Sequence, residues 1–210
     1  MSLTVVHVVG STRADHGGTS RSVPALCEAL DAEGVEVHLV TAVRADPTRD
    51  EEPILPGGDV HVHRIEEQTR LQRTLRSPLG FYRRLWSVVE DVQPDVIHDH
   101  GAWLPSNVVA AWVARRADVP LVVASRGMVT EWSLSHQARK KRIAWHLYQK
   151  HVFRQASLFH ATAPAEVDDL RALGMTQPIA VVPNGVEIPD ALPNGQPTDG
   201  KRALFLSRIH

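Results

Sequence analysis

The residues best suited to chemistry in this sequence come directly after short apolar runs. Gly17 and Gly18 follow the first run and precede a helical pattern. The backbone there can approach a ligand closely, and the free N–H groups of the helix N-terminus can bind an anion. The segment matches neither the GxGxxG dinucleotide pattern nor a P-loop. We predict anion binding, and the alternative is a flexible turn in which Thr19 or Ser20 caps the helix.

Two histidines follow a later apolar run. Alternation along an extended strand puts His98 and His100 on the same side, which predicts a polar cluster with His100 facing substrate. In the alternative interpretation a histidine satisfies neighbouring backbone groups and Trp103 belongs to the core. A metal site is not expected, because nothing nearby has HExxH-like spacing.

An arginine follows the next apolar run. The planar guanidinium of Arg126 suits phosphate or carboxylate, and a structural ion pair at the strand end is the equally weighted alternative. Asn184 and Gly185 follow the last strand before the polar segment, as a dipeptide typical of turns.

These positions fit an α/β domain. Apolar β-branched runs alternate with helical patterns, which predicts a three-layer, Rossmann-like domain with a mainly parallel sheet. Ligands of such sheets bind beyond the carboxyl ends of the strands. We expect strands at 4–9, 35–42, 60–65, 96–98, 121–124, 158–161 and 179–182, and helices at 23–30, 81–92, 108–117, 137–153 and 165–173.

Composition narrows the class of protein. The net charge of −1 gives no global field to recruit nucleic acid, and the single cysteine, Cys27, excludes an internal disulfide. No apolar run approaches the roughly 20 residues that span a bilayer, and a secretory signal pattern is absent, so a cytoplasmic protein is expected. Basic stretches with interleaved aromatics at 64–84 and 139–142 could contact the inner face of a membrane, although a solvated helix face is the favoured interpretation.

The end of the sequence predicts a domain boundary. A polar linker rich in Pro and Gly occupies 188–202, and a fresh apolar run typical of a buried strand begins at Ala203. We therefore expect an N-terminal domain at 1–187, a linker at 188–202 and the first strand of a second domain at 203–210.

Several motifs together resemble a known family. Residues 94–101 (PDVIHDHG), 125–128 (SRGM), 161–166 (ATAPAE) and 182–186 (VPNGV) stand in the order found in the N-terminal half of GT-B fold retaining glycosyltransferases of family 4, also called glycosyl transferase group 1. The resemblance implies that this domain holds the acceptor, that the second domain holds a nucleotide-sugar donor, and that the reaction occurs between them.

The resemblance also implies roles for residues. Arg126 stands where the family usually has a histidine beside the reacting sugar, so Arg126 and His100 are the expected catalytic residues. Gly17, Gly18 and Arg208 are expected to bind the donor diphosphate. No metal or cofactor is required. The expected acceptor-binding or cleft residues are Thr19, His98, Trp103, Asn184 and Glu166.

The predicted function is transfer of a sugar, with retention, to a glycan or lipid-linked acceptor in polysaccharide assembly. The 210 residues are expected to lack activity alone. Two alternatives remain. One is a stand-alone Rossmann-like binding module, in which 203–209 would close the first sheet. The other is a two-domain nucleotide-sugar epimerase.

Overall fold

The computed structural model describes residues 2–14, 17–44, 52–67, 78–136 and 138–186. The predicted linker at 188–202, the strand at 203–210 and Arg208 lie outside these ranges. No helix in the described ranges is both long and apolar enough to cross a membrane.

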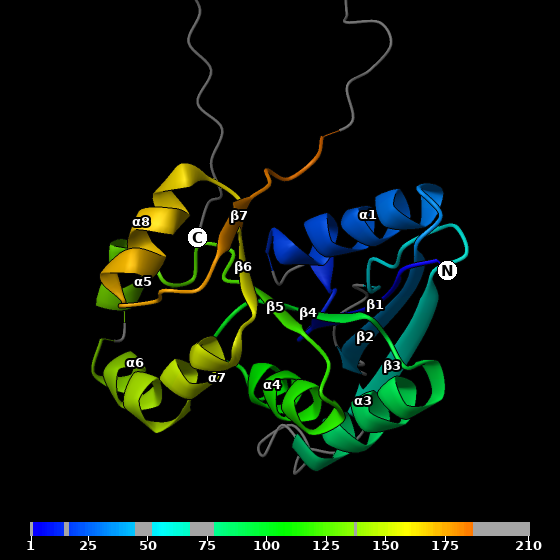
Figure 1. Ribbon diagram of the computed structural model, residues 1–210, viewed down its shortest axis with the longest axis horizontal. Coiled ribbons are helices and arrows are strands. Elements are labelled where there is room, and N and C mark those ends of the chain that lie inside the picture. Colours follow the sequence, from blue (N-terminus) through cyan, green and yellow to red (C-terminus); the bar gives the residue numbers. More distant parts are fainter. Residues whose placement is uncertain (1, 15–16, 45–51, 68–77, 137, 187–210) are drawn as a thin grey trace, which may run out of the picture.

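A parallel sheet forms the centre of the domain (Figure 1). Its strands lie in the order β3-β2-β1-β4-β5-β6-β7, and every neighbouring pair is parallel. The order reverses between β1 and β4, and ligands of such sheets bind at the carboxyl edge of this switch point. The strands are β1 Thr4–Val9, β2 Glu36–Arg44, β3 His61–Glu67, β4 Val96–His100, β5 Leu121–Ala124, β6 Leu158–Ala161 and β7 Ile179–Val181.

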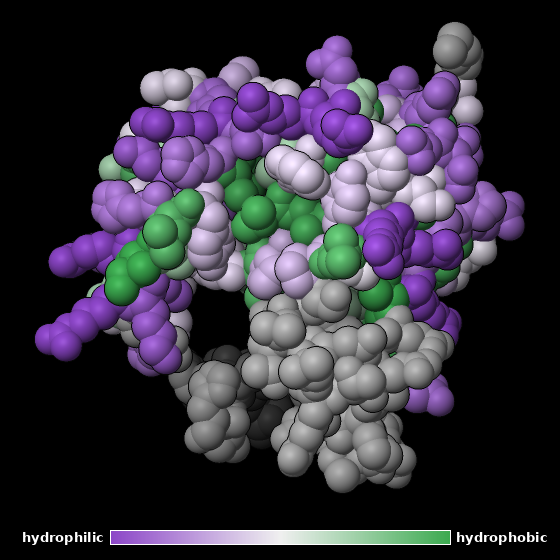
Figure 2. All heavy atoms as spheres, turned by 90° about the horizontal axis from the view of Figure 1, so that it is seen from below, coloured by the Kyte–Doolittle hydropathy of each residue, from purple (hydrophilic) through white to green (hydrophobic). Residues whose placement is uncertain are grey.

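Helices cover both faces of the sheet, as the predicted three-layer arrangement requires. In Figure 1, α1 and α8 lie above the sheet, and α3, α4, α6 and α7 lie below it. From below, polar side chains dominate this lower layer and apolar ones gather in small groups (Figure 2). The helices are α1 Thr19–Ala32, α3 Pro78–Val92, α4 Pro105–Ala117, α5 Glu131–Ser135, α6 Ala138–Ala144, α7 Lys150–Gln155 and α8 Pro164–Ala172, with a π-helical turn, η2 Trp145–Gln149, between α6 and α7.

Alternation along β1 sends its side chains to both sides of the sheet. Val9 packs with Val23 and Cys27 of α1, whereas Val6 and Val8 join the larger cluster below the sheet. A strand buried on both faces must be apolar almost throughout, and β1 is fully buried. His7 is therefore an exception within its own strand, and its position matters for the site.

The predicted α/β class with a parallel sheet is confirmed, one local prediction is wrong, and one short helix was missed. The single helix expected at 137–153 is divided by η2, and α5 was not expected. Thr130 caps α5, because its hydroxyl accepts a hydrogen bond from the backbone N–H of Ser133 at 3.1 Å. The N-cap of α1 is Gly18, with no side-chain cap, so neither Thr19 nor Ser20 plays the alternative capping role.

Candidate active site

Backbone strain marks the carboxyl edge of the central strands. Arg126 follows β5 with φ of 52°, and Trp103 follows β4 with φ of 71°, values that side-chain-bearing residues rarely adopt. The glycines beside them, Gly101 and Gly127, also have positive φ, at 108° and 71°. Residues in this region cost free energy and persist where the surroundings hold them, which is common at functional sites.

The guanidinium of Arg126 is held on two sides. One terminal nitrogen donates to Asn184 Oδ1, and the other donates to His100 Nδ1 at 3.1 Å. Its Nε is buried and has no hydrogen-bond partner among the described residues. Burial lowers the pKa of Arg126, and the nearby Glu166 carboxylate opposes that shift. The arrangement brings Arg126, His100 and Asn184 together and leaves three of the five guanidinium N–H groups, including the buried Nε–H, without a partner among the described residues.

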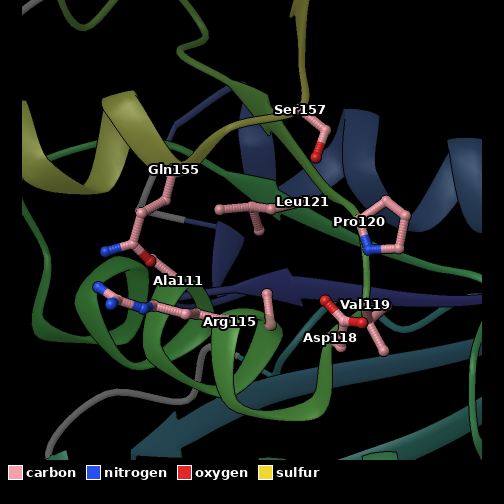
Figure 3. A pocket seen from close by; sticks show the side chains of 9 residues that line it. Ala111, Arg115, Asp118, Val119, Pro120, Leu121, Gln155 and Ser157 are labelled. Atoms are coloured by element: carbon pink, nitrogen blue, oxygen red, sulfur yellow. The ribbon is translucent and has the colours of Figure 1, made fainter.

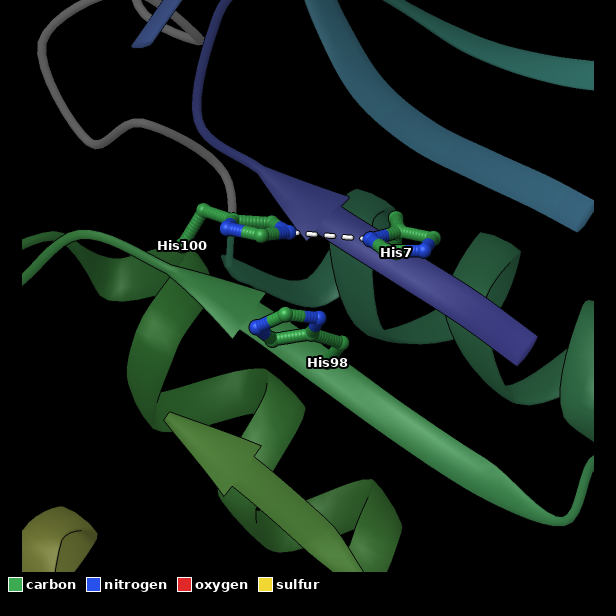
Figure 4. A group of neighbouring side chains, drawn as sticks. All are labelled: His7, His98 and His100. Carbon is green, nitrogen blue, oxygen red and sulfur yellow. Dashed lines mark hydrogen bonds between the residues drawn. The ribbon is translucent and has the colours of Figure 1, made fainter. Parts of the chain in front are cut away.

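Arginine only donates, and this fixes the tautomers of the histidines behind it. His100 must accept at Nδ1 and therefore carries its proton on Nε2, which donates to His7 Nδ1 at 2.9 Å (Figure 4). The two rings stack with centroids 5.2 Å apart. The proton of His7 then lies on Nε2, a buried atom with no partner in the described part of the chain. A donor chain thus runs from Arg126 into the sheet.

A second histidine pair lies beside this chain. The carbonyl oxygen of Val182 accepts from His160 Nε2 at 2.8 Å, so His160 Nδ1 must accept from His98 Nε2, 3.3 Å away. The rings of His98 and His100 have centroids 4.1 Å apart, so the two pairs are in contact. Histidines from β1, β4 and β6 therefore form one network on the face of the sheet between α1 and α8 (Figure 1).

The network is electrically neutral near neutral pH. Burial lowers the pKa of His7 to about 3, and burial also holds the pKa values of His98 and His100 well below the ordinary range. The positive charge of Arg126 acts in the same direction on all three histidines. Arg126 supplies a positive charge beside this network, and the side chain of buried Glu166, which accepts from the backbone N–H of Thr162 at 2.7 Å, acts on that charge.

Trp103 is fixed by its polar groups. Its indole Nε1 donates to the carbonyl of Met128 at 3.0 Å, and its backbone N–H donates to Gln149 Oε1 at 2.8 Å. The Tyr148 hydroxyl donates to the backbone carbonyl of Trp103 at 2.9 Å. Gln149 and Tyr148 both come from η2, so the π turn braces the loop after β4. The Lys141 ammonium lies over the ring of Trp103, 5.7 Å from its centroid.

Three of these histidines lie close enough together to be considered as metal ligands. His7, His98 and His100 each offer a ring nitrogen within 4.8 Å of the others. However, the bond between His7 Nδ1 and His100 Nε2 occupies two nitrogens, and Arg126 places a positive charge beside them. A metal ion would have to break this hydrogen bond and lie beside the positive charge of Arg126. The three histidines therefore fit a hydrogen-bonded network better than a metal site.

The remaining predicted residues are less closely connected. Gly17, Gly18 and Thr19 lie at the start of α1, after β1, and Ser20 Oγ donates to the Gly17 carbonyl at 2.5 Å. No contact between these residues and Arg126 is identified in the described ranges. Arg208 lies outside them. Gly17 has φ of 102°, a conformation that glycine adopts at little cost.

Three residues of the site were missed by the sequence analysis: His7, His160 and Gln149. A signal for the first two existed, because His160 is the one polar residue of β6 and His7 is the one polar residue of β1 apart from Thr4 at its start. Gln149 carried no such signal, because its role depends on the π turn.

A surface pocket lies at the opposite edge of the sheet (Figure 3). Leu121 at the start of β5 and Ser157 just before β6 contribute to its lining, with Arg115, Asp118 and Gln155 at its polar side. None of the predicted site residues lines it. The carboxyl edge therefore remains the candidate active site.

The fold defines a Rossmann-like domain, a class whose ligands generally bind at the topological switch point of the sheet. The model of the family described as "Glycosyl transferase 4-like domain" matches residues 17–185, and the chain belongs to this family. The predicted family resemblance is thereby confirmed. No curated protein matches the sequence.

Solved structures share the fold at low sequence identity. Sucrose-phosphate synthase from Thermosynechococcus elongatus is 17% identical with a TM-score of 0.64, over 86% of this chain and 48% of that one. UDP-GlcNAc 2-epimerase from Neisseria meningitidis is 14% identical with a TM-score of 0.59, over 87% and 47%. The epimerase from Methanocaldococcus jannaschii is 15% identical with a TM-score of 0.56, over 88% and 46%. The chain spans about half the length of these structures.

Proposed function

We propose that this chain is the acceptor-side domain of a glycosyltransferase that moves a sugar from a nucleotide-sugar donor to a glycan or lipid-linked acceptor with retention, as in polysaccharide assembly. The proposal rests mainly on Arg126, whose backbone is strained and whose guanidinium is held between His100 and Asn184. Its buried Nε–H has no partner among the described residues. A fixed cation at this edge suits a developing diphosphate charge.

The proposed mechanism is electrostatic. As the nucleotide diphosphate leaves, Arg126 stabilises its charge, and the N–H groups at the start of α1, beside Gly17 and Gly18, add to that field. His100 and His7 orient the guanidinium without competing for protons, because burial keeps both imidazoles neutral. The acceptor attacks on the face of the leaving group, so that retention needs no protein nucleophile. The ring of Trp103 and the side chains of His98, Asn184, Glu166 and Thr19 would border the acceptor.

The division into domains is part of this proposal. Residues 1–187 form the acceptor-side domain, 188–202 a linker, and 203–210 the first strand of the donor-side domain, with Arg208 on the diphosphate. The chain alone then lacks most of the donor site. The chain covers only about half of each similar solved structure, which supports this division.

The test compares the 210-residue chain with the protein extended through a second domain. Both are incubated with a panel of nucleotide sugars and polysaccharide or lipid-linked acceptors, and products are analysed for anomeric configuration. We expect no transfer by the chain alone and retaining transfer by the extended protein. In the latter, Arg126→Ala should lower kcat about 100-fold or more, and Arg115→Ala, an exposed cation on α4, should not.

Robust transfer by the 210 residues alone would contradict the division of labour. Interconversion of UDP-GlcNAc and its 2-epimer without any acceptor would replace the transferase by an epimerase, the activity named for two of the similar structures.

We also propose that the protein works at the cytoplasmic face of a membrane. Trp132 on α5, Ile143 on α6 and Leu147 on η2 are 74%, 60% and 71% exposed. They accompany exposed Arg139 and Lys140 on α6. Apolar side chains beside cations suit an anionic lipid surface. The chain should sediment with phosphatidylglycerol vesicles and much less with phosphatidylcholine vesicles, and equal sedimentation with both would contradict the idea.

A further inference from the structure

A cluster of three histidines and a glutamate lies far from the candidate active site, at the opposite edge of the sheet. Glu36 and His38 stand at the start of β2, and His61 is the first residue of β3. The register places His38 directly beside His61, and their rings stack with centroids 4.7 Å apart. His63, two residues further along β3, lies on the same face. Arg126 and Trp103 of the candidate active site instead follow the carboxyl ends of β5 and β4.

Glu36, His38 and His61 each offer a ligand atom, and these atoms all lie within 4.8 Å of one another. His38 Nε2 is 3.2 Å from Glu36 Oε1. Two imidazoles and one carboxylate form a donor set that suits zinc and related divalent transition metals. Ligand atoms around one tetrahedral zinc lie roughly 3.3 Å apart, given bonds of about 2.0–2.2 Å. Glu36 and His61 are exposed, so their side chains are free to close that difference.

Residues around the cluster form hydrogen bonds that orient the side chains of Glu36 and His38. Thr4 Oγ1 donates to Glu36 Oε2 at 3.1 Å, which leaves Oε1 facing His38. His63 Nε2 lies 2.9 Å from His38 Nδ1, so the nitrogen of His38 that does not face Glu36 has a hydrogen-bond partner. Metal-bound histidines usually have such a partner for the second nitrogen. The cluster thus has oriented ligands from β2 and supports from β1 and β3.

His61 distinguishes a metal site from a purely structural chain. Without metal, Arg84 donates to His63 Nδ1 at 3.4 Å, His63 to His38, and His38 to Glu36, which links a cation to a carboxylate. The side chain of His61 has no place in that chain and forms no hydrogen bond within the described residues, although its ring stacks on that of His38. One of its ring nitrogens nevertheless lies within 4.8 Å of a ligand atom of Glu36 and of His38.

Metal loading requires a change of tautomer. His38 must bind through Nε2 and donate from Nδ1 to His63, and His63 must then carry its proton on Nδ1, facing Arg84. The Arg84 contact has to break. It is long and lies at an exposed position, so its loss costs little. Both imidazoles stay neutral throughout, and no proton leaves the pair.

We propose that Glu36, His38 and His61 bind a divalent transition metal such as Zn²⁺, with water in the remaining coordination positions. The metal would tie edge strand β3 to β2. The cluster at His7, His98 and His100 makes a useful contrast, because it is buried and lies beside the positive charge of Arg126, whereas this one contains a carboxylate and reaches solvent.

The test is titration of the tag-free 210-residue chain with ZnCl2, by calorimetry and by thermal unfolding. We expect saturable binding with one site per chain and a rise of about 5–10 °C in the unfolding midpoint at a hundredfold excess over Kd. Removal of the metal with EDTA should reverse the rise.

Variants locate the site. His61→Ala and Glu36→Gln alter exposed ligands and should each weaken Zn²⁺ binding at least 10-fold without lowering the midpoint of the metal-free protein. His151→Ala, at an exposed position on α7, is the matched control and should leave affinity unchanged. Absence of saturable binding would overturn the proposal. So would unchanged affinity in both ligand variants, or affinity lost in His98→Leu and kept in His61→Ala.

Discussion

At the scale of single residues, the site depends on a strained arginine. Arg126 adopts φ of 52° and uses its guanidinium to join β5, His100 and Asn184. A left-handed conformation costs an L-residue roughly 1–2 kcal/mol. The surrounding contacts therefore maintain a conformation that the residue itself disfavours, and the strain keeps the cation directed at the edge of the sheet.

This strain predicts a difference between two truncations. Arg126→Gly and Arg126→Ala lose the same guanidinium, but only alanine retains the Cβ that clashes at positive φ. We expect the glycine variant to be more stable than the alanine variant by about 1 kcal/mol in urea unfolding.

The control is Arg115 in α4, a helical position, where the order should reverse because glycine costs about 1 kcal/mol relative to alanine within a helix. The same order at both positions would argue against strain at Arg126.

The sequence indicated some residues of the site and could not indicate others. Arg126 and His100 were predictable because each ends an apolar run at the edge where parallel strands place their ligands. His7 carried a local signal, as a histidine in an apolar strand, but its place beside His98 depends on the pairing of β1 with β4. Strand order is a property of the whole chain, and periodicity within one segment carries no information about it.

At the scale of elements, a buried carboxyl joins strand to helix. Asp99 in β4 accepts from Asn107 Nδ2 of α4 at 2.9 and 3.0 Å. Burial raises the pKa of Asp99 to about 7, and the bonds from Asn107 and the His100 backbone only partly offset that effect. Asn107 in turn accepts at Oδ1 from the backbone N–H of Leu104 at 2.9 Å, so the junction also fixes the start of α4.

The raised pKa predicts a pH dependence that Asp99→Asn removes. Between the ordinary value of 3.8 and about 7, the folded state binds the proton and the unfolded state does not. Stability contributed by Asp99 is therefore fully present below pH 3.8 and is lost as pH rises through about 7, at up to about 1.4 kcal/mol per pH unit. The unfolding free energy of the asparagine variant, relative to the native protein, should rise from pH 5 to pH 7 and then level off.

Urea unfolding at pH 5, 6, 7 and 8 measures this difference. Histidine titrations are common to both proteins and largely cancel in the comparison. A difference that stays constant with pH would show that Asp99 does not titrate in this range.

A second prediction at this scale concerns the contribution of the π turn to stability. Gln149 reaches the backbone N–H of Trp103 from η2, and it is fully buried. Gln149→Met keeps the size of the side chain and removes the acceptor, so it should cost about 1–3 kcal/mol of unfolding free energy.

Gln155→Met is the matched control, because Gln155 Oε1 has no partner in the described ranges, and it should cost clearly less. Equal costs would mean that the Trp103 bond contributes nothing specific. Periodicity at 137–153 predicted one helix here and could not predict the π turn, since the local apolar pattern is helical on both sides of it.

At the scale of the whole molecule, the sheet order explains why so many polar groups meet at one edge. All neighbouring strands are parallel, so the loops after β1, β4, β5, β6 and β7 emerge on the same side. The sequence predicted this layout well, because long apolar runs alternating with helical patterns allow few other arrangements. The family match over 17–185 includes every strand of this sheet except β1.

The proposed domain boundary can be separated from the stand-alone alternative by a truncation after Val186. If 203–209 began a second domain, the first sheet would end at β7, a three-residue strand that is already partly exposed. The truncated chain should then unfold within about 2 °C of the full 210 residues, and hydrogen exchange at Ile179–Val181 should be unchanged.

If 203–209 instead closed the first sheet beside β7, its removal would strip hydrogen bonds from that edge. Exchange there would accelerate and the midpoint would fall by several degrees, since roughly 1 kcal/mol shifts it by about 2–4 °C in a domain of this size. The second result would contradict the two-domain proposal and with it the placement of Arg208 on the donor side.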